Sequence, residues 1–242
     1  GVRLAEEFIR RYLQDHGDWP SGVIVDLWGS ATMRTAGEEF AMALHLLGVR
    51  PVWTEGTERV SGFEILPLPL LDRPRIDVTL RVSGLFRDVF PSLSGLYQQA
   101  VEALAERLET PDWNPYMASS ETARIYGPAP GSYGLGMGAA AEQFSDSGRQ
   151  AAADAWLEAS SYALNAEGSF QDKQGIQNRV AQADSFIHLQ DLPETDLLLS
   201  ADYAAHEAGF AAAKAVVGGQ AALYHIDNTN PDTPAARSLS EE

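Results

Sequence analysis

Arginine side chains that could bind an anionic ligand are concentrated in one stretch of an otherwise acidic sequence. Residues 71–90 contain four of them, namely Arg73, Arg75, Arg81 and Arg87. Guanidinium groups bind carboxylates through two parallel hydrogen bonds. Gly84 would let a ligand approach the backbone closely, and Arg87 and Asp88 follow it in the sequence. The alternative is that these arginines pair with neighbouring acids in a buried strand.

Histidine and glutamate side chains are the candidate bases and metal ligands. The five histidines are His16, His45, His188, His206 and His225, and no two of them have HExxH or HxH spacing. His206 and Glu207 lie together in a predicted helix, whereas His225 lies beside Asp227 near a strand end. A lone histidine of this kind is more often a hydrogen-bonded structural residue than a ligand or base.

Glu38 has two possible roles. Thr35 and Glu38 have the spacing of a capping box, in which Glu38 would only close the first turn of a helix. That helix also begins just after the carboxyl end of a predicted strand, so its first carboxylate would face a ligand cleft there. Glu39 is the alternative carboxylate at the same helix start.

The elements that must position these residues alternate between strands and helices. Helices are predicted over residues 4–13, 35–47 and 97–108, and strands over residues 22–28, 51–54, 64–68 and 76–82. This alternation predicts an α/β fold with a mainly parallel sheet flanked by helices. Ligands bind beyond the carboxyl ends of such strands. Those ends are predicted at residues 28–30, 54–55 and 83–84.

The second half of the sequence is richer in predicted helices. These cover residues 119–126, 149–164, 172–183 and 203–217, with strands at residues 185–190 and 221–226. The glycine-rich residues 127–138, which include Tyr133, have no GK[ST] ending and no preceding predicted strand, so they are neither a Walker loop nor a dinucleotide fingerprint. We therefore expect an α/β region over residues 1–117 and an α-rich region with returning strands over residues 118–242, packed as one module.

Composition excludes several functions. The formal net charge of −17 argues against nucleic-acid binding and against anionic membrane surfaces. The absence of cysteine excludes disulfides and thiolate metal sites. No apolar run has the roughly 20 residues that span a bilayer, so a cytoplasmic protein is expected. The final LSEE resembles the first turn of a helix, which suggests a piece of a longer chain.

Four blocks of sequence resemble, in order, the large subunit of aerobic cobaltochelatase, and more distantly the H subunit of magnesium chelatase. They are residues 28–53 (WGSATMRTAGEEFAMALHLLGVRPVW), 73–91 (RPRIDVTLRVSGLFRDVFP), 123–138 (ARIYGPAPGSYGLGMG) and 183–242, which begin ADSFIHLQ and include HEAGF and YHIDNTNP. One departure is Ala208, where the family pattern would have glycine.

The resemblance implies a segment of a very large subunit that binds a corrin-ring precursor, hydrogenobyrinic acid a,c-diamide, and inserts Co²⁺ during cobalamin biosynthesis. The activity would be that of a ligase forming a nitrogen–metal bond, with Co²⁺ as a substrate. ATP and Mg²⁺ would be bound by two AAA+ partner subunits, and the isolated segment is expected to be inactive. The alternatives are a magnesium chelatase acting on protoporphyrin, a ring-binding module without insertion activity, and a non-catalytic scaffold for the AAA+ subunits.

The same resemblance assigns roles to individual residues. The catalytic candidates are Glu38, His206 and Glu207, of which Glu38 and His206 are also candidate metal ligands. The residues expected to bind the ring are Arg73, Arg75, Gly84, Arg87, Asp88 and Tyr133.

Overall fold

The described part of the chain is built around one large sheet. The structure is a computed structural model that describes residues 1–242 except 57–58, 118–122, 136–144, 166, 193–200 and 240–242. The described strands of this sheet lie in the order β10-β9-β8-β1-β4-β5-β6-β7. Their bounds are β1 Gly22–Leu27, β4 Asp77–Val82, β5 Ile125–Gly127, β6 Tyr162–Asn165, β7 Gly168–Gln171, β8 Ser185–Gln190, β9 Ala222–Asp227 and β10 Ala235–Ser238.

The centre of the sheet is parallel and its edges are antiparallel. Strands β9, β8, β1, β4 and β5 pair in parallel. Strand β10 pairs antiparallel with β9 at one edge, and β6 and β7 add antiparallel pairs at the other. The predicted α/β class with a mainly parallel sheet is therefore confirmed.

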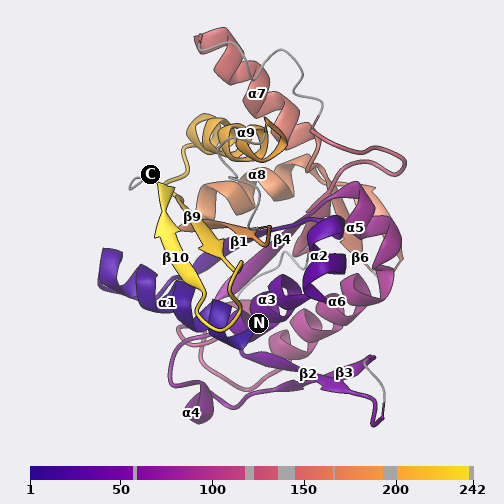
Figure 1. Cartoon of the computed structure of the whole chain (residues 1–242), viewed down its shortest axis with the longest axis vertical. Helices are drawn as coiled ribbons and strands as arrows, with labels where there is room; N and C mark the ends of the chain where they lie inside the picture. The colour runs from indigo at the N-terminus through magenta and orange to yellow at the C-terminus, as the bar shows by residue number, and fades with distance from the viewer. Residues whose placement is uncertain (57–58, 118–122, 136–144, 166, 193–200, 240–242) are drawn as a thin grey trace.

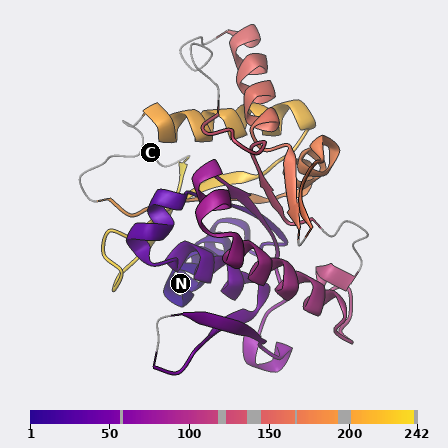
Figure 2. The same ribbon diagram turned by 90° about the vertical axis from the view of Figure 1, so that its right-hand side faces the viewer.

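Helices cover both faces of the sheet (Figures 1 and 2). One face carries α1 (Val2–His16), α3 (Glu38–Leu47) and α6 (Pro91–Ala105). The other carries α7 (Asp146–Glu158), α8 (Lys173–Gln182) and α9 (Ala201–Val217). Short helices α2 (Gly29–Thr35) and α5 (Gly84–Val89) follow β1 and β4 directly. Helix α4 (Leu68–Leu71) and the 3₁₀ helix Pro115–Met117 lie in connections. No helix of the described residues is long and apolar enough to cross a membrane.

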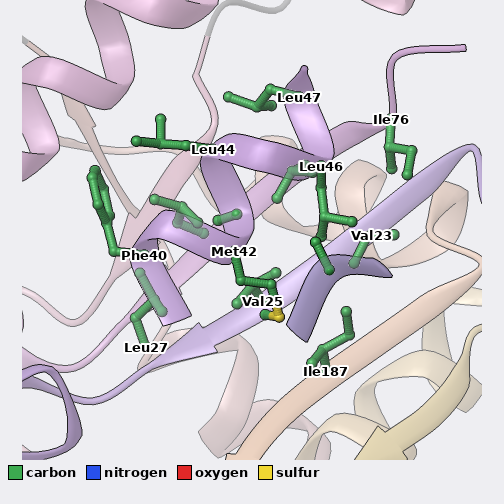
Figure 3. Packing of buried hydrophobic residues seen from close by; sticks show 14 of the residues in the cluster. Val23, Val25, Leu27, Phe40, Met42, Leu44, Leu46, Leu47, Ile76 and Ile187 are labelled. Atoms are coloured by element: carbon green, nitrogen blue, oxygen red, sulfur yellow. The ribbon is translucent and has the colours of Figure 1, made fainter. Parts of the chain in front are cut away.

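Alternation along the central strands divides the core between the two faces. Val23, Val25 and Leu27 belong to the cluster under α3, whereas Ile24 belongs to the cluster under α7–α9. Figure 3 shows the first cluster, in which side chains of α3 meet those of β1. Strands buried on both faces read as almost continuous apolar runs, which is why β1 could be predicted from its sequence.

Strands β2 (Val49–Trp53) and β3 (Val60–Ile65) do not join this sheet. They form a separate antiparallel hairpin, which projects from the body of the molecule (Figure 1). The prediction that residues 51–54 and 64–68 lie in the main sheet is wrong. The connection between the two strands is too short for a parallel crossover, which needs a dozen or more residues. Residues 54–55 consequently do not lie at the ligand-binding edge.

The second half supplies more strands than predicted. The strands at residues 185–190 and 221–226 are confirmed as β8 and β9, but β5, β6, β7 and β10 were not foreseen. The helix predicted over residues 119–126 lies partly outside the described residues, and its end is strand β5. The helix predicted over residues 149–164 ends at Glu158, and β6 follows. Pairing of Tyr126 with Ala163 shows that tertiary contacts outweigh local helix propensity here.

Arg73 and Arg75 fasten the amino end of the sheet. Arg75 forms an ion pair with Glu109 at 2.8 Å and donates to the carbonyl oxygens of Gly48 and Leu66. Arg73 donates to the carbonyl oxygens of Leu46 and His45. Both side chains precede β4, so they hold the end of α3 and the base of the hairpin against the sheet.

We predict that Arg75→Met lowers the free energy of unfolding by about 3–5 kcal/mol, because it leaves Glu109 and several carbonyl groups without their donor. Urea unfolding of the chain measures this change. The control is Arg50→Met: its pair with Glu64 is exposed, with 59% and 50% of the two side chains accessible, and should contribute less than about 1 kcal/mol. Equal losses in the two variants would contradict the structural role of Arg75.

Candidate functional site

A row of buried polar side chains crosses four adjacent parallel strands. We define the polar row as Arg81 on β4, Asp26 on β1, His188 on β8 and His225 on β9. Arg81 is paired in register with Asp26, and His188 with His225. The register between β1 and β8 places Asp26 beside His188. The row lies near the carboxyl ends of the strands, where α/β sheets bind ligands.

The alternation of the strands directs this row towards helices α7–α9. Ile24 and Phe186, two residues before Asp26 and His188, both belong to the core cluster on that face. Residues i and i+2 of a strand point to the same side of the sheet. The polar row therefore replaces one layer of the apolar core.

Helix α9 covers the row. His206 Nδ1 lies 3.3 Å from Asp26 Oδ2, and Glu207 forms a short hydrogen bond with His225 Nε2. One turn further along α9, Phe210 stacks on Phe186 with 4.2 Å between ring centroids. That aromatic contact fixes the register of α9 over the sheet and so places His206 and Glu207 above the polar row.

Asp26 contacts charged and polar side chains from several elements of the site. Arg81 Nη1 lies 3.3 Å from its Oδ1, and Trp28 Nε1 donates to its Oδ2 at 2.7 Å. Burial raises the pKa of Asp26, but its contacts with His206 and Arg81 outweigh this effect and hold the pKa well below its ordinary value. Asp26 is therefore an anion at neutral pH.

The site has an excess of negative charge when its histidines are neutral. Burial lowers the pKa of His188 to about 4, so this imidazole is neutral at pH 7. The two carboxyl groups Asp26 and Glu207 then outnumber the one arginine of the site, Arg81. Such a cluster suits protons and cations better than anions.

Glu38 lies at the same edge of the sheet but does not form the predicted capping box. Gly37 is the N-cap of α3, and the Glu38 carboxylate accepts a hydrogen bond from Asn228 Nδ2 at 2.6 Å. Ala36 and Gly37 both have left-handed backbone conformations. Thr35 Oγ1 still accepts from the backbone N–H of Glu38 at 3.3 Å, so one half of the predicted box forms, whereas the Glu38 carboxylate binds Asn228. Thr35 donates instead to Glu39 at 2.5 Å, and burial raises the pKa of Glu39.

Four of the predicted ring-binding residues do come together, and we call them the loop cluster: Gly84, Arg87, Asp88 and Tyr133. A side chain at Gly84 would meet Ser132 O at 2.4 Å, so the glycine-rich loop packs directly on α5. Arg87 donates to the carbonyl oxygens of Pro128 and Ala129 and pairs with Asp88. Tyr133 donates to Asp88 at 2.6 Å and is 64% exposed. Arg87 thus has a different set of partners from the ring carboxylates that were expected.

The other predicted site residues lie at opposite ends of the sheet. Arg73 and Arg75 lie at the amino end of the sheet, away from Glu38, His206 and Glu207. Among the described residues, no group of three or more histidine, aspartate or glutamate side chains is arranged to hold a metal ion. Asp26, Trp28, His188 and Asn228 were not predicted as site residues, and Arg81 was predicted only as one of the four clustered arginines. One signal in the sequence could have revealed the site. Asp26 is a charged residue within the apolar strand β1, and His188 is an imidazole within the mostly apolar strand β8.

Comparison with known proteins gives consistent matches over the whole chain. The family model described as CobN/Magnesium Chelatase matches residues 1–242. The aerobic cobaltochelatase subunit CobN of Pseudomonas aeruginosa is 41% identical over 264 aligned residues, and the chloroplastic magnesium-chelatase subunit ChlH of Oryza sativa subsp. japonica is 28% identical over 253. These alignments cover 100% and 96% of this chain but 21% and 18% of the relatives.

A solved structure, that of the catalytic subunit of cobaltochelatase from Mycobacterium tuberculosis, is similar with a TM-score of 0.93 and 33% sequence identity. The match covers 100% of this chain and 22% of the cobaltochelatase subunit in that structure. The chain therefore spans about a fifth of the length of its relatives.

We predict that His188 makes the chain less stable as pH falls. Its pKa is 6.5 in the unfolded chain and about 4 when folded beside Asp26, His206, His225 and Glu207. As pH falls from 6.5 towards 4, the unfolded state takes up the proton first, so folding stability is lost in that window. The contribution of His188 between pH 7 and 5 should be about 2 kcal/mol.

Urea unfolding at a series of pH values measures this loss in the wild type and in His188→Gln. The variant should lose correspondingly less stability on acidification, whatever its stability at pH 7. His45→Gln, outside the polar row, is the control. An unchanged pH slope in His188→Gln would contradict the prediction.

Proposed function

Because the chain belongs to the CobN/magnesium chelatase family, we propose that it is a segment of the ring-binding subunit of a cobaltochelatase. The whole subunit would insert Co²⁺ into hydrogenobyrinic acid a,c-diamide in cobalamin biosynthesis, as a ligase forming nitrogen–metal bonds. ATP and Mg²⁺ would be bound by two AAA+ partner subunits. Greater identity to the cobaltochelatase subunit than to the magnesium-chelatase subunit supports cobalt over magnesium.

The observation that carries this proposal is the polar row beneath His206 and Glu207. Insertion of a divalent cation removes the inner N–H protons of the ring, so it needs bases close to the ring nitrogens. Neutral imidazoles and carboxylates can accept those protons. The excess negative charge of the site also favours the approach of a cation over that of an anion.

We assign Glu38, His206 and Glu207 to the chemical step. A carboxylate and an imidazole are suitable transient ligands for Co²⁺, which accepts both oxygen and nitrogen donors. Glu38 and His206 would hold the ion loosely before it enters the ring. Glu38 is connected to the polar row through β9, since its partner Asn228 follows that strand closely after His225.

The loop cluster is our candidate for contact with the ring. Tyr133 offers an exposed aromatic face, and the carboxylate of Asp88 beside it is 41% exposed. Arg87 holds the loop in place through its bonds to Pro128 and Ala129. Gly84 allows the loop to lie against α5. Arg73 and Arg75 have no part in this proposal, because both lie at the opposite end of the sheet.

A scaffold for the AAA+ subunits is the second candidate function. The observation in its favour is that Arg73, Arg75 and Arg87 are all engaged in contacts within the chain. Variants that alter the chemical step or ring binding, without altering the fold, separate the two candidates.

We predict that Glu38→Gln in the full-length subunit, assembled with its partners, lowers the rate of Co²⁺ insertion at least tenfold while ring binding is unchanged. The amide preserves the shape of the side chain but cannot accept a ring proton. Absorbance of the metallated product measures the rate. Glu6→Gln, at a glutamate whose side chain is 62% exposed, is the control. A normal insertion rate in Glu38→Gln would remove Glu38 from the mechanism.

We predict that Arg87→Ala weakens binding of the ring substrate about tenfold, equivalent to about 1.4 kcal/mol, because the loop that carries Tyr133 loses its attachment to α5. Quenching of protein fluorescence by the metal-free ring measures the dissociation constant. Arg50→Ala on the hairpin is the matched control. Under the scaffold function both variants would bind the ring, if at all, with wild-type affinity.

A further inference from the structure

Asp26 lies at the centre of the polar row but has no part in the mechanism proposed above. We infer that Asp26 is a positioning residue that holds His206 with Nδ1 protonated and Nε2 directed away from the carboxylate. This inference rests on the proposed function for its catalytic meaning, but its geometry can be tested separately.

The contacts of Asp26 are those of a group that orients others. Its side chain has no exposed surface, so it does not touch a ligand itself. Its oxygens lie 2.7 Å from Trp28 Nε1, 3.3 Å from Arg81 Nη1 and 3.3 Å from His206 Nδ1. The Trp28 ring lies 4.6 Å from the His206 ring between centroids, which limits how the imidazole can turn.

Two neighbours compete for His206 Nδ1. Arg81 Nη1 also lies 3.3 Å from this nitrogen and could donate to it only if Nδ1 carried its lone pair. That lone pair would then face the ionised oxygen of Asp26, which is repulsive. A proton on Nδ1 converts the same contact into a charge-assisted hydrogen bond. Arg81 has other acceptors in Asp26 Oδ1, Ser160 Oγ and the carbonyl oxygen of Ala159, so we assign the proton to Nδ1.

The sheet register explains why Asp26 stays ionised. Arg81 lies directly opposite Asp26 on the neighbouring strand, and its charge offsets the cost of burying a carboxylate. The other groups facing the carboxylate are His188 at 3.6 Å and, beyond it along the row, His225 with Glu207. None of these groups can replace Arg81 as a permanent cation.

This arrangement defines the path of one proton. With Nδ1–H donating to Asp26, the single imidazole lone pair is on Nε2. As Co²⁺ leaves Nε2 to bond to a ring nitrogen, that lone pair would accept the proton that the same ring nitrogen loses. Asp26 would stabilise the resulting imidazolium without touching the ring. Partners of this kind that orient a histidine change activity or metal affinity by 10–100-fold when replaced in other proteins.

Insertion rates in the full-length subunit with its partners test the coupling between the two residues. We expect Asp26→Asn to slow insertion by at least about tenfold and His206→Ala by about 100-fold, with little change in the KM for the ring. The double variant should be no slower than His206→Ala alone, because Asp26 acts through His206. Multiplication of the two effects would overturn the inference.

The matched control is Asp77→Asn. Asp77 pairs with Arg124 at 2.6 Å and Arg179 at 2.7 Å at the amino end of β4, so its replacement also disturbs an aspartate–arginine cluster of the sheet. It should lower the free energy of unfolding, and it should change the insertion rate by the same factor in the His206→Ala background as in the wild type. An effect of Asp77→Asn that disappears in that background would show that the coupling is not specific to Asp26.

The tautomer of His206 gives a readout that does not depend on activity. Long-range ¹H–¹⁵N correlation spectra of the chain should show Nδ1 of His206 protonated, and Asp26→Asn should shift the proton to Nε2 or mix the two tautomers. An Nε2–H tautomer in the wild type would overturn the inference. A protonated Nδ1 together with normal insertion by His206→Ala would instead overturn the proposed function and leave the orientation of His206 established.

Discussion

Asp26 is a fully buried carboxylate in the central strand of the sheet, and several features of the structure serve to accommodate its charge. An isolated buried carboxylate costs several kcal/mol, so it persists only with a close cation and hydrogen-bond donors. Arg81 supplies the cation through strand pairing, and Trp28 supplies a donor from the end of the same strand. A slip of one residue in the pairing of β1 with β4 would place the side chains of Asp26 and Arg81 on opposite faces of the sheet. The ion pair therefore specifies the strand register as well as the site.

The two ends of the sheet use charge differently. At the amino end, arginines form hydrogen bonds and ion pairs with carbonyl groups and acids of the connecting segments, as in the contacts of Arg75 with Glu109 and Leu66. At the carboxyl end, imidazoles and carboxylates outnumber cations, and short helices begin at glycines that permit close approach. A side chain on Gly29, for example, would meet the backbone of Phe86 at 2.6 Å. Stability and the proposed chemistry are thus placed at opposite ends of the same strands.

The sequence predicts those parts of the fold that depend on local pattern. A nearly continuous apolar run identified β1, as expected of a strand buried on both faces, and alternation with β-branched residues identified β4. Strands β8 and β9 were also predicted. Pairing is not local, so the β2–β3 hairpin was assigned to the wrong sheet. The polar row escaped prediction for the same reason: Arg81, Asp26 and the two histidines become neighbours only when the register of four strands is known. Glu38 was predicted at the carboxyl edge and lies there, whereas its carboxylate binds Asn228 and does not complete the capping box with Thr35. His206 and Glu207 were predicted only to lie in a helix, and their position over the sheet depends on tertiary packing.

The division of the site between the two halves of the sequence constrains how it forms. Strands β1 and β4 come from the first half, whereas β8, β9 and the covering helix α9 come from the second. Neither half alone can complete the row, since Asp26 needs Arg81 beside it and His206 above it. Contact between Phe210 and Phe186 is made within the second half and sets the height of α9 over β8. Apolar packing in the second half thereby positions His206 over a carboxylate from the first half. The proposed chemistry therefore requires β1 to be paired with both β4 and β8.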